Sequence, residues 1–316
     1  MRFLMTMLRP QSRQTLLLVA LAGPLMAQAP APASLVREGV TEKLTDHVWA
    51  IPDGSASLVP NIGIVVGEKA VLVVDTGMGA RNAETVLREV AKVGKDKKGK
   101  PKPIYLVTTH VHPEHDMGAH AFPKSSKLIR SKTQVEDIAA GAGMNLVPIF
   151  AARSDLNKEL LKDAHHRDAD IIFDGAYTLD LGGLEARIGA MGTNHTHGDT
   201  IVFVDGVLFS GDIAMKPQPS FTNPTATITH WLDSLDALEA MSPITIVPSH
   251  GPIGGLDLIQ GYRAYLTRIR DRTAELKKAG KTQDEAIATI TGEMSAQYPD
   301  KNRLAGAIRA GYAEAK

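Results

Sequence analysis

Short apolar runs alternate with amphipathic stretches along most of this 316-residue chain. Apolar runs of four to eight residues between turn residues indicate buried strands, and apolar positions spaced three and four apart indicate helices. The first half predicts strands at 47–51, 62–66, 70–74, 104–107 and 127–129. Asn82 should cap a helix whose apolar positions, from Val86 to Val93, fall on one face. The pattern therefore predicts a layered arrangement of strands and helices.

The same alternation returns after residues 141–150, an apolar segment without clear period. This segment either overhangs a pocket or packs Met144 and Phe150 into the core. Further strands are expected at 171–173, 177–179, 184–188, 201–204, 207–209 and 244–247. The remainder is predicted to be helical, with one helix marked by Ile259 to Leu276. Capping boxes are indicated where Thr133 precedes Glu136 and where Thr282 precedes Glu285.

Candidate metal ligands gather directly after the predicted strand 104–107. Three histidines and two carboxylates fall within seven residues, and they are His110, His112, Glu114, His115 and Asp116. Imidazole and carboxylate are ligands that zinc accepts. Side-chain direction alternates along an extended segment, so His110 and His112 should face the same side. A solvated histidine-rich loop is the alternative interpretation of this motif alone.

Other predicted strand ends carry the same residue types. Asp75 follows the strand 70–74, and Asp212 follows the strand 207–209. His195 and His250 come soon after two further strands. In layered α/β folds the strand ends meet at one edge, where groups from distant sequence positions converge. The sequence therefore predicts a metal site before any family is considered.

This set of separated motifs resembles the metallo-β-lactamase superfamily over roughly residues 48–254. The resemblance implies an α/β fold, a four-layer αββα sandwich, here with a C-terminal helical extension. It also implies two groups of metal ligands that share one aspartate. The first group is His110, His112, His195 and Asp212, and the second is Glu114, His115, Asp212 and His250. Asp75 would orient a ligand through a hydrogen bond.

The activity implied by the resemblance is that of a binuclear zinc-dependent hydrolase, with iron or manganese as alternative metals. A metal-bridging hydroxide would attack an ester, lactone, thioester, phosphoester or β-lactam bond. Glu114, Asp212 and Asp75 are the predicted catalytic residues, with Glu114 steering the hydroxide or accepting its proton. Alternatives are a periplasmic metallo-β-lactamase proper, an iron-binding oxidoreductase, and a non-catalytic metal-binding protein of this fold.

Two departures from the family pattern bear on these predictions. Glu114 stands where the family usually has aspartate, so the second metal is left either to Glu114 or to the neighbouring Asp116. Asp212 stands where the β-lactamases of the family mostly have cysteine or serine. The aspartate therefore favours other hydrolase branches, whereas export to the periplasm would suit a β-lactamase.

Composition narrows the choice of site and partner. The chain has no cysteine, which excludes disulfides and thiolate ligands. Its 35 basic and 35 acidic residues balance, which argues against a nucleic-acid or membrane-surface protein. A small-molecule substrate is expected, no nucleic-acid partner is expected, and a homo-oligomer stays open.

The N-terminal segment predicts export. Basic residues Arg2, Arg9 and Arg13 precede a short apolar run at 15–22, and small residues follow up to Ala29. The apolar run is too short for a stable membrane span, although an uncleaved anchor is the alternative. We therefore expect a signal peptide at 1–29, the sandwich domain at 30–255, and C-terminal helices at 256–316 packed on it. The predicted location is the periplasm or outside the cell.

Overall fold

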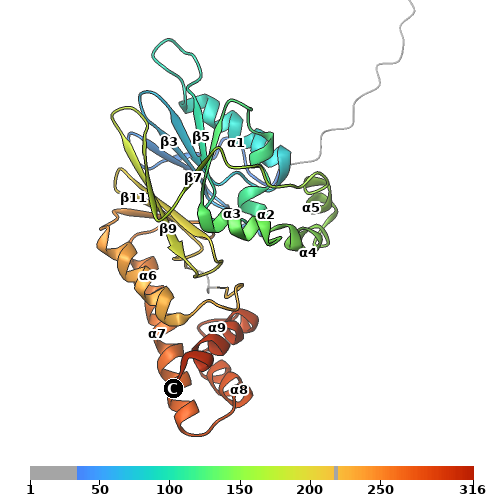
Figure 1. Ribbon diagram of the computed structural model, residues 1–316, viewed down its shortest axis with the longest axis vertical. Coiled ribbons are helices and arrows are strands. Elements are labelled where there is room, and N and C mark those ends of the chain that lie inside the picture. The colour runs from blue at the N-terminus through green and yellow to red at the C-terminus, as the bar shows by residue number, and fades with distance from the viewer. Residues whose placement is uncertain (1–33, 217–219) are drawn as a thin grey trace, which may run out of the picture. The chain divides into compact units, whose positions relative to one another are not determined.

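Figure 1 shows the computed structural model of this chain, which describes residues 34–216 and 220–316. The predicted signal peptide lies outside the described residues, so it stays a prediction. Within the described ranges, no helix is long and apolar enough to cross a membrane.

One sheet contains the strands of the first half of the chain, and they pair in sequence order. Neighbours from β1 to β4 run antiparallel, and neighbours from β4 to β7 run parallel. The bounds are β1 Glu42–Lys43, β2 Val48–Ile51, β3 Ile62–Val66, β4 Val71–Val74, β5 Ile104–Val107, β6 Lys127–Ser131 and β7 Ile171–Phe173. Strands β3 and β4 are buried at every position, so their sequences are continuous apolar runs.

The second sheet has the order β12-β11-β10-β9-β8. Only β11 and β12 run parallel among these strands. The bounds are β8 Ala176–Asp180, β9 Glu185–Gly192, β10 Asp199–Val204, β11 Val207–Gly211 and β12 Thr245–Pro248. Asp205 and Gly206 form the tight turn between β10 and β11, both with positive φ, as a type I′ hairpin turn requires.

Apolar clusters hold the two sheets and their helices together as four layers. The facing sides of the sheets share one cluster, to which Val65 and Val202 belong. The other side of the first sheet packs against α1 (Gly79–Val93), and the other side of the second packs against α6 (Ile228–Ala240). Figure 1 shows α1 and α6 beside different sheets. This arrangement confirms the αββα sandwich that the family resemblance implied.

The C-terminal helices share a core with the second sheet. They are α7 (Leu256–Lys278), α8 (Gln283–Met294) and α9 (Lys301–Glu314). Ile269 and Ile308 join Ile246 of β12 and Trp231 of α6 in one cluster. The predicted capping box of Thr282 and Glu285 is confirmed at the start of α8. A helical extension therefore follows the sandwich and is built onto its outer face.

Short helices lie between β5 and β7. They are α2 Pro113–Asp116, η1 Ala119–Ala121, α3 Lys132–Ala139, η2 Met144–Leu146, α4 Val147–Ala151 and α5 Asp155–Leu160.

Two predicted helix caps are wrong. Asn82 lies inside α1, where its side-chain oxygen accepts hydrogen bonds from the backbone of Leu35 and Val36. Ser131, rather than Thr133, caps α3 by accepting from the Gln134 backbone at 3.2 Å. Neighbouring capping residues compete, and only tertiary contacts decide between them.

Candidate metal centre

The end of β5 delivers the densest group of candidate ligands. After Val107 the chain bends through residues 109–112 and becomes extended at His112, whose ψ is 151°, and Pro113 then opens α2. Proline suits the first helical position because its fixed φ is already helical. This one turn of helix places His115 beside the bend that carries His110, and their ring centres are 4.1 Å apart. The bend and the short helix therefore face the same region.

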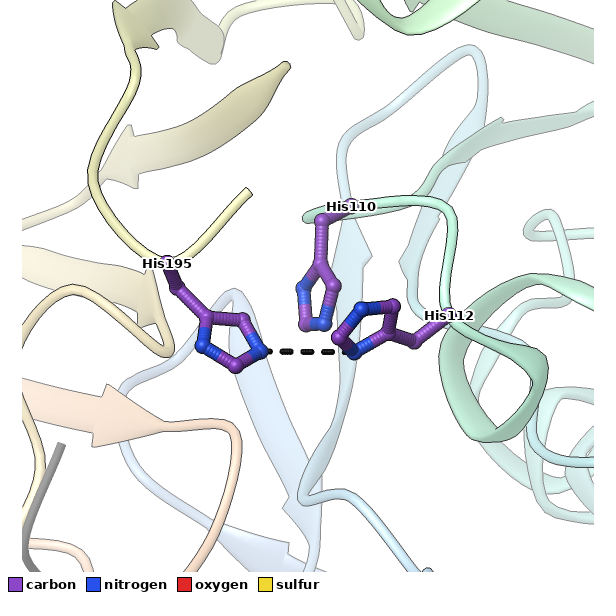
Figure 2. Close-up of side chains that lie close together, drawn as sticks. All are labelled: His110, His112 and His195. Atoms are coloured by element: carbon purple, nitrogen blue, oxygen red, sulfur yellow. Dashed lines mark hydrogen bonds between the residues drawn. The ribbon is translucent and has the colours of Figure 1, made fainter. Parts of the chain in front are cut away.

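Three other strand ends complete the group from the second sheet. His195 follows β9, Asp212 directly follows β11, and His250 lies two residues after β12. Figure 2 shows His195, from the segment after β9, pointing toward His110 and His112, which share the segment after β5. Gly211 has φ +59°, and a Cβ added there would lie 3.1 Å from Thr109 Cβ. A glycine therefore lets the end of β11 approach the end of β5 closely.

Three overlapping groups have ligand atoms within 4.8 Å of one another. They are His110 with His112 and His195, His110 with His115 and Asp212, and Glu114 with His115 and His250. His195 Nε2 lies 3.3 Å from His112 Nδ1 and 3.4 Å from Asp212 Oδ2. Glu114 Oε1 lies 3.8 Å from His115 Nε2 and 4.0 Å from His250 Nε2. The structure thus brings all seven predicted ligands into one continuous cluster.

Contacts behind the cluster orient three of the imidazole rings. His195 Nδ1 lies 2.6 Å from the Ser220 carbonyl oxygen, and His250 Nδ1 lies 2.9 Å from that of Val59. A carbonyl oxygen only accepts, so each Nδ1 must donate, and in the neutral ring Nε2 carries the lone pair. His115 Nδ1 lies 2.9 Å from Asp75 Oδ2 in the same manner. Each ring therefore directs a metal-binding nitrogen into the cluster.

Four buried polar atoms of the cluster have no hydrogen-bond partner among the described residues. They are His110 Nε2, Glu114 Oε2, His115 Nε2 and Asp212 Oδ1. An unsatisfied buried polar atom costs roughly 1–3 kcal/mol, so four together in a folded protein call for a binding partner. Nitrogen and carboxylate oxygen are the donors that a borderline divalent cation takes. The residues present fit a metal centre.

The electrostatics of the cluster suit cation binding. Burial and the neighbouring histidines lower the pKa of His110 and of His112 well below 6.5, which leaves both rings neutral as ligands. Burial would raise the pKa of Asp212, but His195 and His250 lower it, so its carboxylate stays ionised. Burial would lower the pKa of His115, but the charge and hydrogen bond of Asp75 raise it to about 9, so a cation that binds this ring would displace a proton from it.

Asp116, the alternative acidic ligand, points elsewhere, and so does His197, which lies two residues after His195. Asp116 Oδ1 lies 2.7 Å from Arg130 Nη2, and its other oxygen contacts His166. Its carboxylate is therefore occupied behind the motif, and Glu114 is the acidic residue of α2 that faces the cluster. His197 Nδ1 lies 3.0 Å from Asp137 and belongs to none of the three groups.

Asp75 lies behind His115 rather than among the residues that line the cavity. It has φ +65°, and its Oδ1 accepts from the Thr109 backbone at 2.7 Å. We predict that Asp75→Asn lowers metal affinity by roughly 10–100-fold, because His115 loses the anionic partner that fixes its ring. Competition with a zinc chelator measures this affinity. An affinity within twofold of the wild type would mean that Asp75 does not orient His115.

A cavity of about 920 Å³ opens onto the cluster. His112, Glu114, His195, Asp212 and His250 line its base. Leu146, Ile149 and Phe150 of the 141–150 segment line another part, as the pocket interpretation of that segment predicted. Met144, predicted as a core residue, is 39% exposed. The first residues of α9 and those preceding it also line the cavity, including Tyr298 and Arg303.

The sequence did not predict that residues near α9 would line the cavity. They are Gln297, Tyr298, Pro299, Asp300 and Arg303, and Arg153, which follows α4, also lines it. Trp231 of α6 does not reach the cavity, because it is fully buried and donates Nε1–H to the Ile213 carbonyl at 2.8 Å. Only the position of these helices in the fold decides which of their side chains reach the cavity.

Comparisons with known proteins agree with this geometry. The model of the metallo-beta-lactamase superfamily matches residues 57–250. A metallo-beta-lactamase from Pontibacter korlensis is similar in structure with a TM-score of 0.53 and 20% identity, over 71% of this chain and 96% of that one. The metallo-beta-lactamase DIM-1 gives a TM-score of 0.53 and 20% identity, over 72% of this chain and 97% of that one.

The stereoselective inverting sec-alkylsulfatase Pisa1 from Pseudomonas sp. is similar over more of the chain. Its TM-score is 0.64 at 17% identity, and the match covers 86% of this chain and 49% of that one. This coverage exceeds the part of the chain that precedes α7, so the likeness extends into the C-terminal helices. At these identities the likeness concerns the fold. No curated protein matches the chain.

Proposed function

Because this chain belongs to the metallo-beta-lactamase superfamily, whose model matches residues 57–250, we propose that it is an exported, zinc-dependent hydrolase of small molecules. The observation that carries the proposal is the group of four buried, unpartnered ligand atoms among the described residues, at the base of a cavity. Such a group would be costly without a cation, and the cavity gives a substrate access to it. The bond cleaved is an ester, lactone, thioester, phosphoester or β-lactam.

Two zinc ions would be held by the seven residues of the cluster. His110, His112 and His195 would bind the first ion, Glu114, His115 and His250 the second, and Asp212 would bind both. Bound divalent ions in such a site lower the pKa of a coordinated water and polarise the scissile bond. The neutral rings of His110 and His112 leave their lone pairs available to the cation.

The chain's own groups prepare the site for hydrolysis before any substrate arrives. Carbonyl and carboxylate partners fix the rings of His115, His195 and His250, so little reorganisation is needed when the cations bind. Glu114 lines the cavity, and its Oε2 is buried without a hydrogen-bond partner among the described residues. We propose that Glu114 has two roles: it would help to bind the second ion, and it would orient the water and accept its proton.

Metal content and turnover test this proposal together. The mature protein, stripped and reconstituted, should bind about two zinc ions and hydrolyse at least one member of a panel. The panel comprises a chromogenic cephalosporin, a nitrophenyl ester, a lactone, a thioester and a phosphodiester. His110→Ala should abolish the turnover. Absence of turnover on the whole panel with two zinc ions bound would refute the hydrolase, and iron as the resident metal would favour the oxidoreductase alternative.

A second candidate activity is the hydrolysis of an alkyl sulfate ester. The favouring observation is that the likeness to the sec-alkylsulfatase reaches into the C-terminal helices, which contribute a wall of the cavity. A secondary alkyl sulfate therefore joins the panel. Sulfate release from it in the absence of any other turnover would decide for this candidate.

Export is part of the proposal and rests on the N-terminal sequence pattern. The metal and turnover measurements are therefore made on protein from the periplasmic fraction. Its first residue should be Pro30, since the predicted signal peptide ends at Ala29. Retention of the first 29 residues at a membrane would support the uncleaved anchor instead.

A further inference from the structure

A second cavity, of about 410 Å³, shares no lining residue with the cavity at the metal centre among the described residues. His120 and His165 both line it, and the centres of their rings lie 4.2 Å apart. His120 belongs to η1, and His165 to the segment between α5 and β7. We propose that these two histidines and Asp163 form a site for a divalent cation such as zinc. The site is separate from the metal centre and does not depend on the proposed hydrolase function.

The imidazole of His120 is buried without a partner. Its side chain is 12% exposed, and neither ring nitrogen has a hydrogen-bond partner in the part of the chain that the structure describes. The nearest carboxylate oxygen is Asp163 Oδ2, which lies 3.6 Å from Nε2, beyond hydrogen-bonding distance. Unsatisfied buried polar atoms are costly, and a polar ring that lines a cavity in this state calls for a ligand.

Both rings offer a lone pair to such a ligand. His165 Nδ1 lies 2.8 Å from the Asp163 carbonyl oxygen, which only accepts, so Nδ1 donates and the neutral ring carries its lone pair on Nε2. Burial lowers the pKa of His120, and the neighbouring His165 lowers it further, so this ring is neutral at pH 7. Neutral imidazoles bind cations of the zinc class, whereas an anion would require protonated rings.

Asp163 supplies the third ligand, a carboxylate. Its Oδ2 already lies 3.6 Å from His120 Nε2, and the nitrogen and oxygen ligands of a tetrahedral zinc ion are about 3.3 Å apart. The Asp163 side chain is 53% exposed, and His165 is exposed as well. Exposed side chains change rotamer readily, so these two can turn toward one cation without disturbing buried atoms. Water would complete the coordination.

The other polar residues of this cavity leave the site to these three. His166 is occupied, because its Nδ1 contacts Asp116 and its Nε2 lies 2.9 Å from the Ala142 carbonyl oxygen.

The basic residues of the cavity do not repel a cation strongly. Arg167 forms an ion pair with Asp170 at 3.2 Å, and Lys124 is exposed to solvent, which screens its charge. Asp168, also exposed, adds a negative charge to the wall.

A cation at this site would join η1 to the segment that follows α5. His165 directly precedes His166, whose ring contacts Asp116 behind the metal centre. The cation would therefore fix the segment that carries His166, and its inferred role is structural. A ligand that binds only the folded form stabilises that form by mass action.

Zinc content tests the inference. Equilibrium dialysis followed by elemental analysis measures the zinc bound to the mature protein as free zinc rises beyond the concentration that fills the metal centre. The wild type should then bind about one further ion per chain. His120→Gln and His165→Gln should each bind this ion at least about tenfold more weakly, because each loses one of the two imidazole ligands.

The matched control is His47→Gln, since His47 is an exposed histidine that lines neither cavity. This variant should bind the further ion as the wild type does. Equal zinc content in the wild type and in the variants of His120 and His165, at every free zinc concentration, would overturn the inference.

Hydrogen exchange with Asp163→Asn tests the same site without changing a buried side chain. The Ala164 amide, between two of the ligands, donates to the Leu161 carbonyl oxygen at 3.1 Å and exchanges only when this segment opens. Free zinc at about ten times the dissociation constant of the site should slow this exchange about tenfold in the wild type, because opening must release the cation. Asp163→Asn should lose most of the slowing. Absence of slowing in the wild type, or equal slowing in the variant, would overturn the inference.

Discussion

Asp212→Asn should strongly lower both metal content and hydrolysis. Asp212 Oδ2 lies 3.4 Å from His195 Nε2, and its Oδ1 lies 4.0 Å from His250 Nε2. Asparagine keeps the shape of the side chain but removes the charge that both cations would share. We expect about one zinc ion or fewer per chain and a roughly thousandfold loss of kcat/KM, because the lost stabilisation is several kcal/mol at about 1.4 kcal/mol per tenfold.

Elemental analysis and turnover on the best substrate of the panel measure the two effects. Asp284→Asn is the matched control, since Asp284 is an exposed residue of α8. It should leave both quantities unchanged. Two zinc ions in the Asp212→Asn protein with more than about a tenth of the wild-type turnover would mean that Asp212 is not a shared ligand.

The metal centre could be anticipated because its residues occupy strand ends that the sequence marks clearly. Asp75 directly follows the continuous apolar run of β4, which is easily recognised because it is buried on both faces, and Asp212 follows the apolar residues of β11 after Ser210 and Gly211. Strand ends of one layered fold converge by topology, so proximity in space follows from position in the chain. His110 and His112 do lie together, with ring centres 4.5 Å apart, but a bend at residues 109–112 brings them there rather than the alternation of an extended segment.

The role of Glu114 could not be predicted from the local sequence pattern. The sequence alone did not decide whether Glu114 or Asp116 is the acidic ligand of the second site. Both carboxylates lie in one turn of helix, and the turn directs them to different sides. Asp116 points behind the motif because it forms an ion pair with Arg130 of β6. This pair depends on the pairing of β5 with β6, which the local sequence pattern does not reveal.

The wall of the cavity was beyond prediction for a related reason. Arg303 precedes a buried leucine in an ordinary amphipathic helix, and its spacing predicts a solvated position. The helix reaches the cavity because α7 and α9 pack on the outer face of the second sheet through residues such as Ile269 and Ile308. Helix packing of this kind is a property of three-dimensional contact, which sequence periodicity does not encode.

Behind the centre lies His166, which neighbours His165, Arg167 and Asp168 in the sequence and is nevertheless buried. The side chain of His166 is 7% exposed, and its Nδ1 contacts Asp116. Arg130 lies on the other side of the same carboxylate, and its Nη1 donates to Thr108 Oγ1 at 3.1 Å. The three side chains form a buried charged network directly behind His115, which they hold in place through the backbone of α2.

Arg130→Met should therefore be the most destabilising substitution outside the apolar core. Arg130 is 1% exposed, and methionine would fill much of its volume while leaving the Asp116 carboxylate buried with only His166 beside it. Removing one partner of a buried pair costs about 3–5 kcal/mol. Urea unfolding of the metal-free protein measures this loss, because bound zinc would stabilise both proteins by mass action.

The pH dependence distinguishes this network from simple loss of packing. Burial would raise the pKa of Asp116, but the charge of Arg130 lowers it below the ordinary 3.8. A lowered pKa stabilises the folded state above pH 3.8, and this contribution disappears as the pH falls through the lowered value. The difference in the free energy of unfolding between Arg130→Met and wild type should accordingly shrink toward low pH.

Arg88→Met is the control, because it breaks an ion pair at a side chain that is 51% exposed. It should lower the free energy of unfolding by less than about 1 kcal/mol. If Arg130→Met were as mild as Arg88→Met, or its cost independent of pH, the network would not stabilise the fold through charge.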